Sequence, residues 1–143
     1  MKIAVVTDST AYLTKEEYAE YGIYVLPMSV IFGQETYREE IDITAEEFYA
    51  KVKSSPVFPT STQPAVGETY ELFRELAKDY DAIIPITISS GISGTYQTCV
   101  AVAEDMKDEI AIYPIDSEIS CAPQARAVKL AAIMAKSGEY SPE

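Results

Sequence analysis

The sequence of 143 residues contains no histidine. Histidine is the side chain that most often activates a serine or cysteine nucleophile, and it is a common ligand of zinc and other metals. Its absence excludes Ser-His-Asp and Cys-His catalysis within this chain, together with metal sites built on imidazole.

Cysteine is almost as scarce, since the chain has only Cys99 and Cys121. The two do not form a C-x-x-C pair, and both lie in apolar stretches with helical spacing. We therefore expect two reduced, buried cysteines that behave as small hydrophobic side chains. A role as a nucleophile or a disulfide is the less favoured alternative.

Basic residues are few: 11 lysines and arginines face 23 acidic residues, which gives a formal net charge of −12. A protein that binds a phosphate backbone needs a basic surface, so nucleic acid is not an expected partner. The same charge repels anionic membrane surfaces. The acidic surface either keeps the protein in solution or docks a basic partner.

Long apolar runs are also missing, and Ala82–Ile86 is typical of the longest. No segment is therefore expected to insert into a membrane. The start of the chain, Met1–Asp8, lacks the extended apolar stretch of a signal peptide. These absences predict a cytoplasmic protein.

What the chain does contain is a regular alternation of short apolar runs and amphipathic stretches. The capping boxes Thr14–Glu17 and Thr44–Glu47 each start a helix. The other expected elements are strands at 2–7, 23–31, 82–88 and 110–115, a small strand or hairpin at 32–40, a stiff loop at 54–64, and helices ending near Tyr80 and spanning 92–106 and 122–136.

Strands that alternate with helices predict the α/β class, here a three-layer α/β/α arrangement around a mostly parallel sheet. One domain is expected over residues 1–137, with 138–143 as a tail or the start of a linker. In the helix at 92–106, Tyr96, Val100 and Ala103 are expected to form one apolar face.

The stretch 87–97, T-I-S-S-G-I-S-G-T-Y-Q, carries five hydroxyls, two glycines and no charge. Hydroxyl residues also follow or precede expected elements at 7–10, 59–64 and 116–120. Ligands of open parallel sheets bind beyond the carboxyl ends of the strands, so these four segments are expected to converge on one rim.

A helix N-terminus surrounded by neutral donors is suited to a single anionic headgroup. Segments 59–64 and 87–97 contain no lysine or arginine, which favours a carboxylate or acyl phosphate over a triphosphate and does not match a P-loop. The simpler alternative is helix capping, which we expect for Ser9, Ser117 and Ser120 taken singly. Asp8 and Asp116 are expected to act as caps or backbone acceptors rather than as catalysts.

At these residues the sequence resembles the DegV family of bacterial fatty-acid-binding proteins. The resemblance rests on Val6-Thr7-Asp8-Ser9, Pro59-Thr60-Ser61-Thr62-Gln63-Pro64, Ile88–Gln97 and Ile115-Asp116-Ser117. It implies a carrier without catalytic activity or cofactor. Such a carrier holds a long-chain fatty acid and presents its carboxylate to a fatty acid kinase. The headgroup ligands implied for this chain are Ser61, with Thr62 beside it, and Ser93, with Ser90 and the backbone at Gly94 as neighbours.

The sequence departs from the resemblance in two respects. Family members are about twice as long, and an Arg and a His of their second domain complete the headgroup site. The segment after Ser117 is usually glycine-rich in the family, whereas Ser120–Ala125 has no glycine here. We therefore expect weak or absent lipid affinity for this chain by itself, and a homodimer through its exposed half-cleft.

Two other functions stay open on the sequence alone. One is an interaction domain that has lost its ligand. The other is a phosphotransferase or hydrolase with Ser89, Ser90 or Ser93 as nucleophile. The enzyme is disfavoured because a serine hydroxyl needs an activating base, and only Asp8, Asp116 and lysines or arginines outside the hydroxyl-rich segments could serve as one.

Overall fold

The computed structural model describes residues 1–142, and a parallel sheet forms their centre. The strand order is β2-β1-β6-β7, with β8 also paired to β6. Their bounds are β1 Ile3–Asp8, β2 Ile23–Leu26, β6 Ala82–Thr87, β7 Ala111–Ile112 and β8 Ile115–Asp116. Val5 of β1 pairs with Ile23 of β2 on one side and with Ile84 of β6 on the other.

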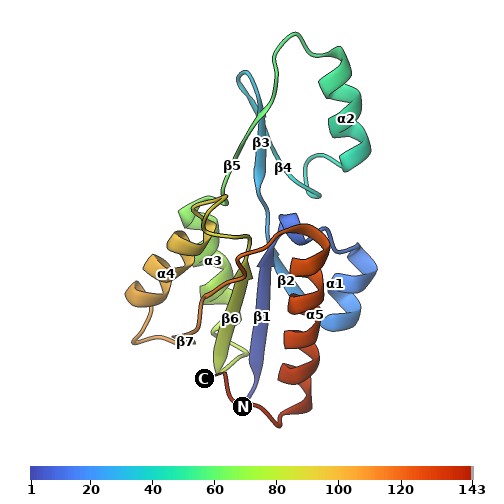
Figure 1. Cartoon of the computed structure of the whole chain (residues 1–143). Coiled ribbons are helices and arrows are strands. Elements are labelled where there is room, and N and C mark those ends of the chain that lie inside the picture. The colour runs from blue at the N-terminus through green and yellow to red at the C-terminus, as the bar shows by residue number, and fades with distance from the viewer. Residues whose placement is uncertain (143) are drawn as a thin grey trace.

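Helices cover both faces of this sheet (Figure 1). On one face lie α3 (Val66–Leu76) and α4 (Thr95–Asp105), which bury Phe73, Cys99 and Val102 against Val6 and Ile83. On the other face lie α1 (Lys15–Tyr21) and α5 (Cys121–Ser137). The α/β class with a mostly parallel sheet is thereby confirmed.

Local sequence explains where the helices begin and end. Thr14 and Thr44 each accept a hydrogen bond from the amide three residues later, and the carboxylates of Glu17 and Glu47 accept one from the amide of the cap residue. Both capping boxes predicted from the sequence are therefore present. Gly22 ends α1 in the left-handed conformation, with φ 63°, where glycine has no Cβ to strain.

A second, antiparallel sheet projects beyond the first, and we call residues 29–62 the arm (Figure 1). Its strands are β3 (Ser29–Phe32), β4 (Glu35–Arg38) and β5 (Thr60–Thr62), in the order β4-β3-β5. The helix α2 (Ala45–Ser54) covers it, with Phe48 packed against Val30 and Phe32. The rest of the chain, with the parallel sheet and its helices, we call the body. The arm is joined to the body at Pro27-Met28 and at Gln63-Pro64.

The arm corrects two predictions. The single strand expected at 23–31 is two strands in different sheets, because the chain leaves the parallel sheet at Pro27-Met28. The loop expected at 54–64 contains β5, which pairs with β3. The strand expected at 110–115 is likewise divided into β7 and β8.

The buried face of α4 also differs from the prediction. Thr98, Cys99 and Val102 point into the core, whereas Val100 is 41% exposed. The spacing of Tyr96 and Val100 correctly indicated a helix, but the predicted buried face was the wrong one. Thr98 and Cys99 occupy core positions that the prediction did not assign to the apolar face. Cys99 is buried as expected, while Cys121 is exposed, which contradicts the prediction; both are free thiols.

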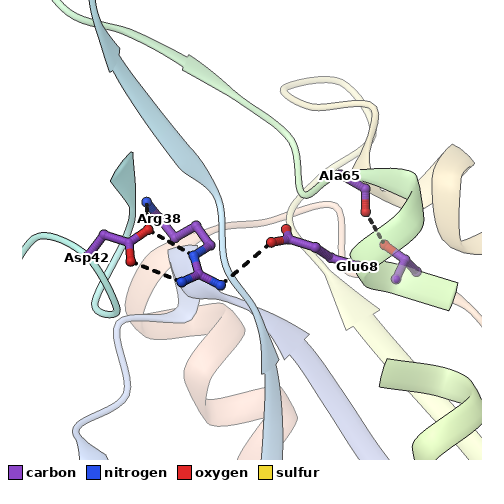
Figure 2. A network of polar contacts seen from close by, with 5 residues as sticks. Arg38, Asp42, Ala65 and Glu68 are labelled. Carbon is purple, nitrogen blue, oxygen red and sulfur yellow. Dashed lines mark hydrogen bonds and ion pairs between the residues drawn. The ribbon is translucent and has the colours of Figure 1, made fainter. Parts of the chain in front are cut away.

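An ion-pair network connects the arm to the body (Figure 2). Arg38 at the end of β4 binds Asp42 through two guanidinium nitrogens, at 2.8 and 3.0 Å. The same guanidinium lies 3.8 Å from Glu68 in the first turn of α3. Figure 2 shows Arg38 reaching between the two carboxylates, so one side chain links the arm to the helix layer.

Candidate hydroxyl-lined headgroup site

The carboxyl end of β1 is organised by Asp8, which is fully buried. Its carboxylate accepts hydrogen bonds from the amides of Thr10, at 3.1 Å, and Ile88, at 2.7 Å, and from the Thr10 hydroxyl. The role expected for Asp8 as a cap and backbone acceptor is confirmed. The bond to Ile88 fixes the start of the hydroxyl-rich loop against β1.

Gln124 of α5 completes this buried network, and sequence reasoning did not identify it. Its side-chain amide donates to the Thr7 hydroxyl, at 3.1 Å, and to Asp8, at 3.3 Å, and its carbonyl accepts from Thr10, at 2.9 Å. The sequence offered only a glutamine within an alanine-rich helix, and the structure adds that this glutamine is fully buried and therefore needs hydrogen-bond partners.

The loop after β6 turns sharply between Ser89 and Ser93. The Ser93 amide donates to the Ser89 carbonyl, at 3.1 Å, and the Gly91 amide donates to the Ser89 hydroxyl, at 3.2 Å. The hydroxyls of Ser93 and Thr95 lie 2.9 Å apart. Ser93 is therefore held just before the start of α4. The hydroxyl of Thr95 contacts the sulfur of Met28, so this end of the loop lies beside Met28.

The five hydroxyls of this stretch have different roles. Thr87 is buried, and among residues 1–142 its hydroxyl oxygen is the one buried side-chain nitrogen or oxygen atom without a hydrogen-bond partner. Thr95 is also buried, and Ser89 serves the turn. Ser90 and Ser93 are half-buried.

Ser90 faces the β8 end rather than the arm. Its amide donates to Asp116 at 3.0 Å, and the Glu118 amide donates to the same oxygen at 3.0 Å. Bonds from the Ser90 side chain and from these two amides lower the pKa of Asp116. Asp116 is thus a backbone acceptor, as expected, and its lowered pKa makes it a weak base.

The capping roles expected for three serines are wrong. Ser9 donates its hydroxyl to Glu39, at 2.7 Å, and accepts from the Met28 amide, at 2.9 Å, so it links the body to the arm. Ser117 bonds within its own turn to Ile119. Ser120 precedes α5 but makes no cap bond, and its hydroxyl contacts the Cys121 sulfur.

A pocket of about 230 Å³ lies where the arm meets the body. Segments far apart in the sequence line it: Thr10 and Tyr12 after β1, Met28 before β3, Glu39 after β4, Ser61, Thr62 and Gln63 at β5, and Ile88, Ile92 and Ser93 before α4. Ser61, Thr62 and Ser93, three of the predicted ligands, therefore share one pocket.

The other two predicted ligands do not line this pocket. Ser90 is engaged with Asp116, as described above. Gly94 lies against the Gln63 side chain, and a Cβ there would overlap Oε1 and lie 3.3 Å from Cδ of Gln63. Gln63 in turn donates to the Thr98 hydroxyl at 2.8 Å. Glycine at 94 thus lets the Ser61 segment pack on the start of α4. Segment 116–120 does not reach the pocket.

The pocket also contains residues that sequence reasoning missed, chiefly Met28 and Glu39. Within the described part of the chain no lysine or arginine lines it. The N-terminus of α4 adjoins it, and the first amides of a helix have no acceptor within the helix. The surrounding hydroxyls add neutral donors.

Cys99 is not set up as a nucleophile. Burial, and to a lesser extent the charge of Asp8, raises the pKa of the Cys99 thiol to about 12, so the thiol stays protonated. Cys121 is exposed, and its backbone is left-handed, with φ 57°. That conformation suits glycine, the residue type expected in this segment from the family resemblance.

Comparison with known proteins identifies the family. The model of the family described as "Uncharacterised protein, DegV family" matches residues 2–143. Protein DegV of Bacillus subtilis is 50% identical over 143 residues, which cover all of this chain and 50% of that protein. This chain belongs to the DegV family.

Solved DegV structures share the fold. The crystal structure of DegV, a fatty acid binding protein from Bacillus subtilis, superposes with a TM-score of 0.95 at 48% identity, covering 99% of this chain and 50% of that one. A DegV family protein from Thermus thermophilus, described by its fatty acid binding, has a TM-score of 0.88 at 27% identity, with 98% and 49% covered.

This chain spans about half the length of the DegV relatives it matches, as the 47% identical protein of Halalkalibacterium halodurans also illustrates, with 96% of this chain and 48% of the relative covered. Among residues 1–142, none of the helices has the length and apolar character needed to cross a membrane.

Proposed function

We propose that this DegV chain forms one wall of a fatty-acid-binding site, in which the pocket between arm and body holds the carboxylate. The observation that carries this proposal is the convergence of Ser61, Thr62 and Ser93 on a single pocket without a cation. These hydroxyls orient the headgroup and keep a partly buried carboxylate from losing its hydrogen bonds, which would be costly.

The apolar lining supports an acyl chain as the rest of the ligand. Ile88, Ile92 and Met28 adjoin the hydroxyls, and Tyr12 connects this pocket to a smaller one beneath α2. Each buried methylene contributes about 0.8 kcal/mol, so the tail supplies most of the affinity while the hydroxyls set its direction.

A carrier role fits these residues better than catalysis. Ser93 contacts the Thr95 hydroxyl rather than a base, and Ser90 lies against Asp116, whose pKa is lowered. The carrier would present the carboxylate of the bound fatty acid to a fatty acid kinase in the cytoplasm.

Nuclear magnetic resonance titration of the ¹⁵N-labelled chain with decanoate tests the proposal and detects weak binding. We expect shifts for the amides of Ser61, Ser93 and Gly94. Ser61→Ala and Ser93→Ala should each weaken binding by about 1–3 kcal/mol, since each leaves the carboxylate short of a partner.

Ser137→Ala is the matched control, because Ser137 ends α5 and bonds only locally to Met134 and Glu139. Decanoate affinity that is unchanged in both pocket variants would exclude these serines from the headgroup site. No amide shifts at all would contradict fatty-acid binding by this chain.

A further inference from the structure

Glu39 is an unexpected side chain in a pocket proposed to hold an anion. It follows β4 and lines the same pocket as Ser61 and Ser93. It is only partly buried, and within residues 1–142 it forms no ion pair. A second carboxylate brought into this pocket would face a like charge.

The Glu39 carboxylate is held in place rather than free to turn away. Its Oε2 accepts the Ser9 hydroxyl at 2.7 Å, while its backbone amide donates to the Met28 carbonyl at 2.8 Å. Among the described residues no group donates a hydrogen bond to its Oε1. A glutamine oxygen could accept the Ser9 bond equally well, so the link between arm and body does not require a charge here.

The groups around Glu39 do not neutralise it. Glu40 follows it in the chain, Asp8 precedes Ser9 at the end of β1, and Tyr12 and Tyr49 line the smaller pocket beneath α2 together with Glu39. Burial, followed by the charge of Glu39, raises the pKa of Tyr12, so its hydroxyl stays neutral. Burial, and to a lesser extent nearby carboxylates that include Glu39, raises the pKa of Tyr18 in α1 to about 12, so that hydroxyl is neutral as well. Arg38, the neighbouring cation, is engaged with Asp42 and Glu68.

We propose that Glu39 is a charge-selecting residue of this pocket, which accepts an acyl carboxylate together with one proton that Glu39 and the ligand share. The inference rests on the proposed function. When R-COO⁻ enters beside the Glu39 carboxylate, one H⁺ is taken from solution and bridges the two oxygens, so the pair carries a single negative charge. Two carboxyl groups in one site resist ionising together.

Two consequences follow from the shared proton. Affinity for a carboxylate falls as pH rises, because the complex holds one proton more than the separated partners; the limit is about tenfold per pH unit. A dianionic headgroup of the same chain length binds less well than the carboxylate, since one shared proton leaves a further negative charge against Glu39. An uncharged headgroup is indifferent to both effects.

The test is a titration of the full 143-residue chain with decanoate at pH 6, 7 and 8, followed by nuclear magnetic resonance. Decanoate is ionised throughout this range. For the unaltered chain we expect log Kd to rise with pH with a slope approaching one. In Glu39→Gln the slope should fall towards zero, with affinity at pH 8 at least about tenfold tighter.

Glu40→Gln is the matched control. It makes the same change in net charge one residue away. Glu40 is exposed and lines the smaller pocket beneath α2, but it does not line the headgroup pocket. This variant should keep the slope of the unaltered chain. Decanol should bind with no pH dependence in all three proteins, and decyl phosphate should gain more from Glu39→Gln than decanoate does.

The outcomes separate the two proposals. Decanoate binding with the same pH slope in the unaltered chain and in Glu39→Gln would overturn the role of Glu39 and leave the fatty-acid site standing. Loss of the pH slope in Glu40→Gln as well would show that the slope depends on the net charge of the protein, and this result would also overturn the role of Glu39. No binding by any of the proteins at any pH would contradict the proposed function itself, and the inference with it.

Discussion

At the scale of single residues, the contact between Gly94 and Gln63 decides how the two hydroxyl segments meet. Gln63 lies over the Gly94 backbone and bonds to Thr98, so the segment of Ser61 is fixed against the start of α4. Both residues belong to motifs that the sequence singled out. Position 94 requires glycine because the Gln63 side chain takes up the space of a Cβ. The two residues are 31 positions apart in the sequence, so residue spacing does not reveal this contact.

We predict that Gly94→Ala is destabilising only while Gln63 is present. The added Cβ displaces the Gln63 side chain and breaks its bond to Thr98, which should cost about 1 kcal/mol. In a Gln63→Ala background the same change should be neutral or slightly stabilising, because alanine restricts the unfolded chain. Urea unfolding of the four proteins gives the coupling energy, and additive effects would contradict this account.

Other residues show where sequence reasoning stops. Asp8 and Asp116 were predicted as backbone acceptors because they follow strands and precede turns, which is a local relation. Glu39 was missed because Arg38-Glu39-Glu40 reads as a solvated charged segment. Only the antiparallel pairing of β3 with β4 and β5 brings it beside Ser61.

At the scale of elements, the helices followed from the sequence more closely than the strands did. Both capping boxes are local, so α1 and α2 begin where predicted. The run 23–31 is apolar throughout, and Pro27 and Met28 are as buried as the strands on either side. No change of pattern marks the point where the chain passes from the parallel sheet to the arm.

The ion pairs of Arg38 should limit the mobility of the arm. Removing them with Arg38→Gln is expected to lower the hydrogen-exchange protection of amides in β3, β4 and β5 a few-fold, because both carboxylates lose their partner. Protection in β1 and β6 should not change. Arg74→Gln is the control, since it removes the same charge and an ion pair, to Glu109 at 3.9 Å, within the body.

Acid should reproduce this effect in the unaltered chain. Hydrogen bonds from Arg38 lower the pKa of Asp42 to about 2, below its value in an unfolded chain. The stabilisation is therefore complete above the unfolded pKa of about 4 and is lost as pH falls through about 2. Equal acid sensitivity of the arm in Arg38→Gln would show that Asp42 is not the group responsible.

At the scale of the whole molecule, the site depends on the contact between the arm and the body. The parallel sheet provides Ser93 and the N-terminus of α4, and the arm provides Ser61, Thr62 and Glu39. The α/β class and the three layers were predictable because apolar runs typical of strands alternate with amphipathic stretches typical of helices along the sequence. The arm was not, since a small antiparallel sheet depends on which of several short runs pair.

The rim of the pocket exposes apolar side chains, and we predict that the chain forms a homodimer through them. Tyr12 and Ile92, which both line the pocket, are 58% and 68% exposed. Ile92→Glu should shift the protein towards monomer in concentration-dependent light scattering, because a charge would have to be buried at the contact. Leu130→Glu, on the 57% exposed outer face of α5, is the control and should leave the dimer intact. If the unaltered chain scatters as a monomer at every concentration, the rim is not a self-association surface; if Leu130→Glu alone disrupts the dimer, the contact lies on α5 and the pocket stays open to ligand in the assembled form.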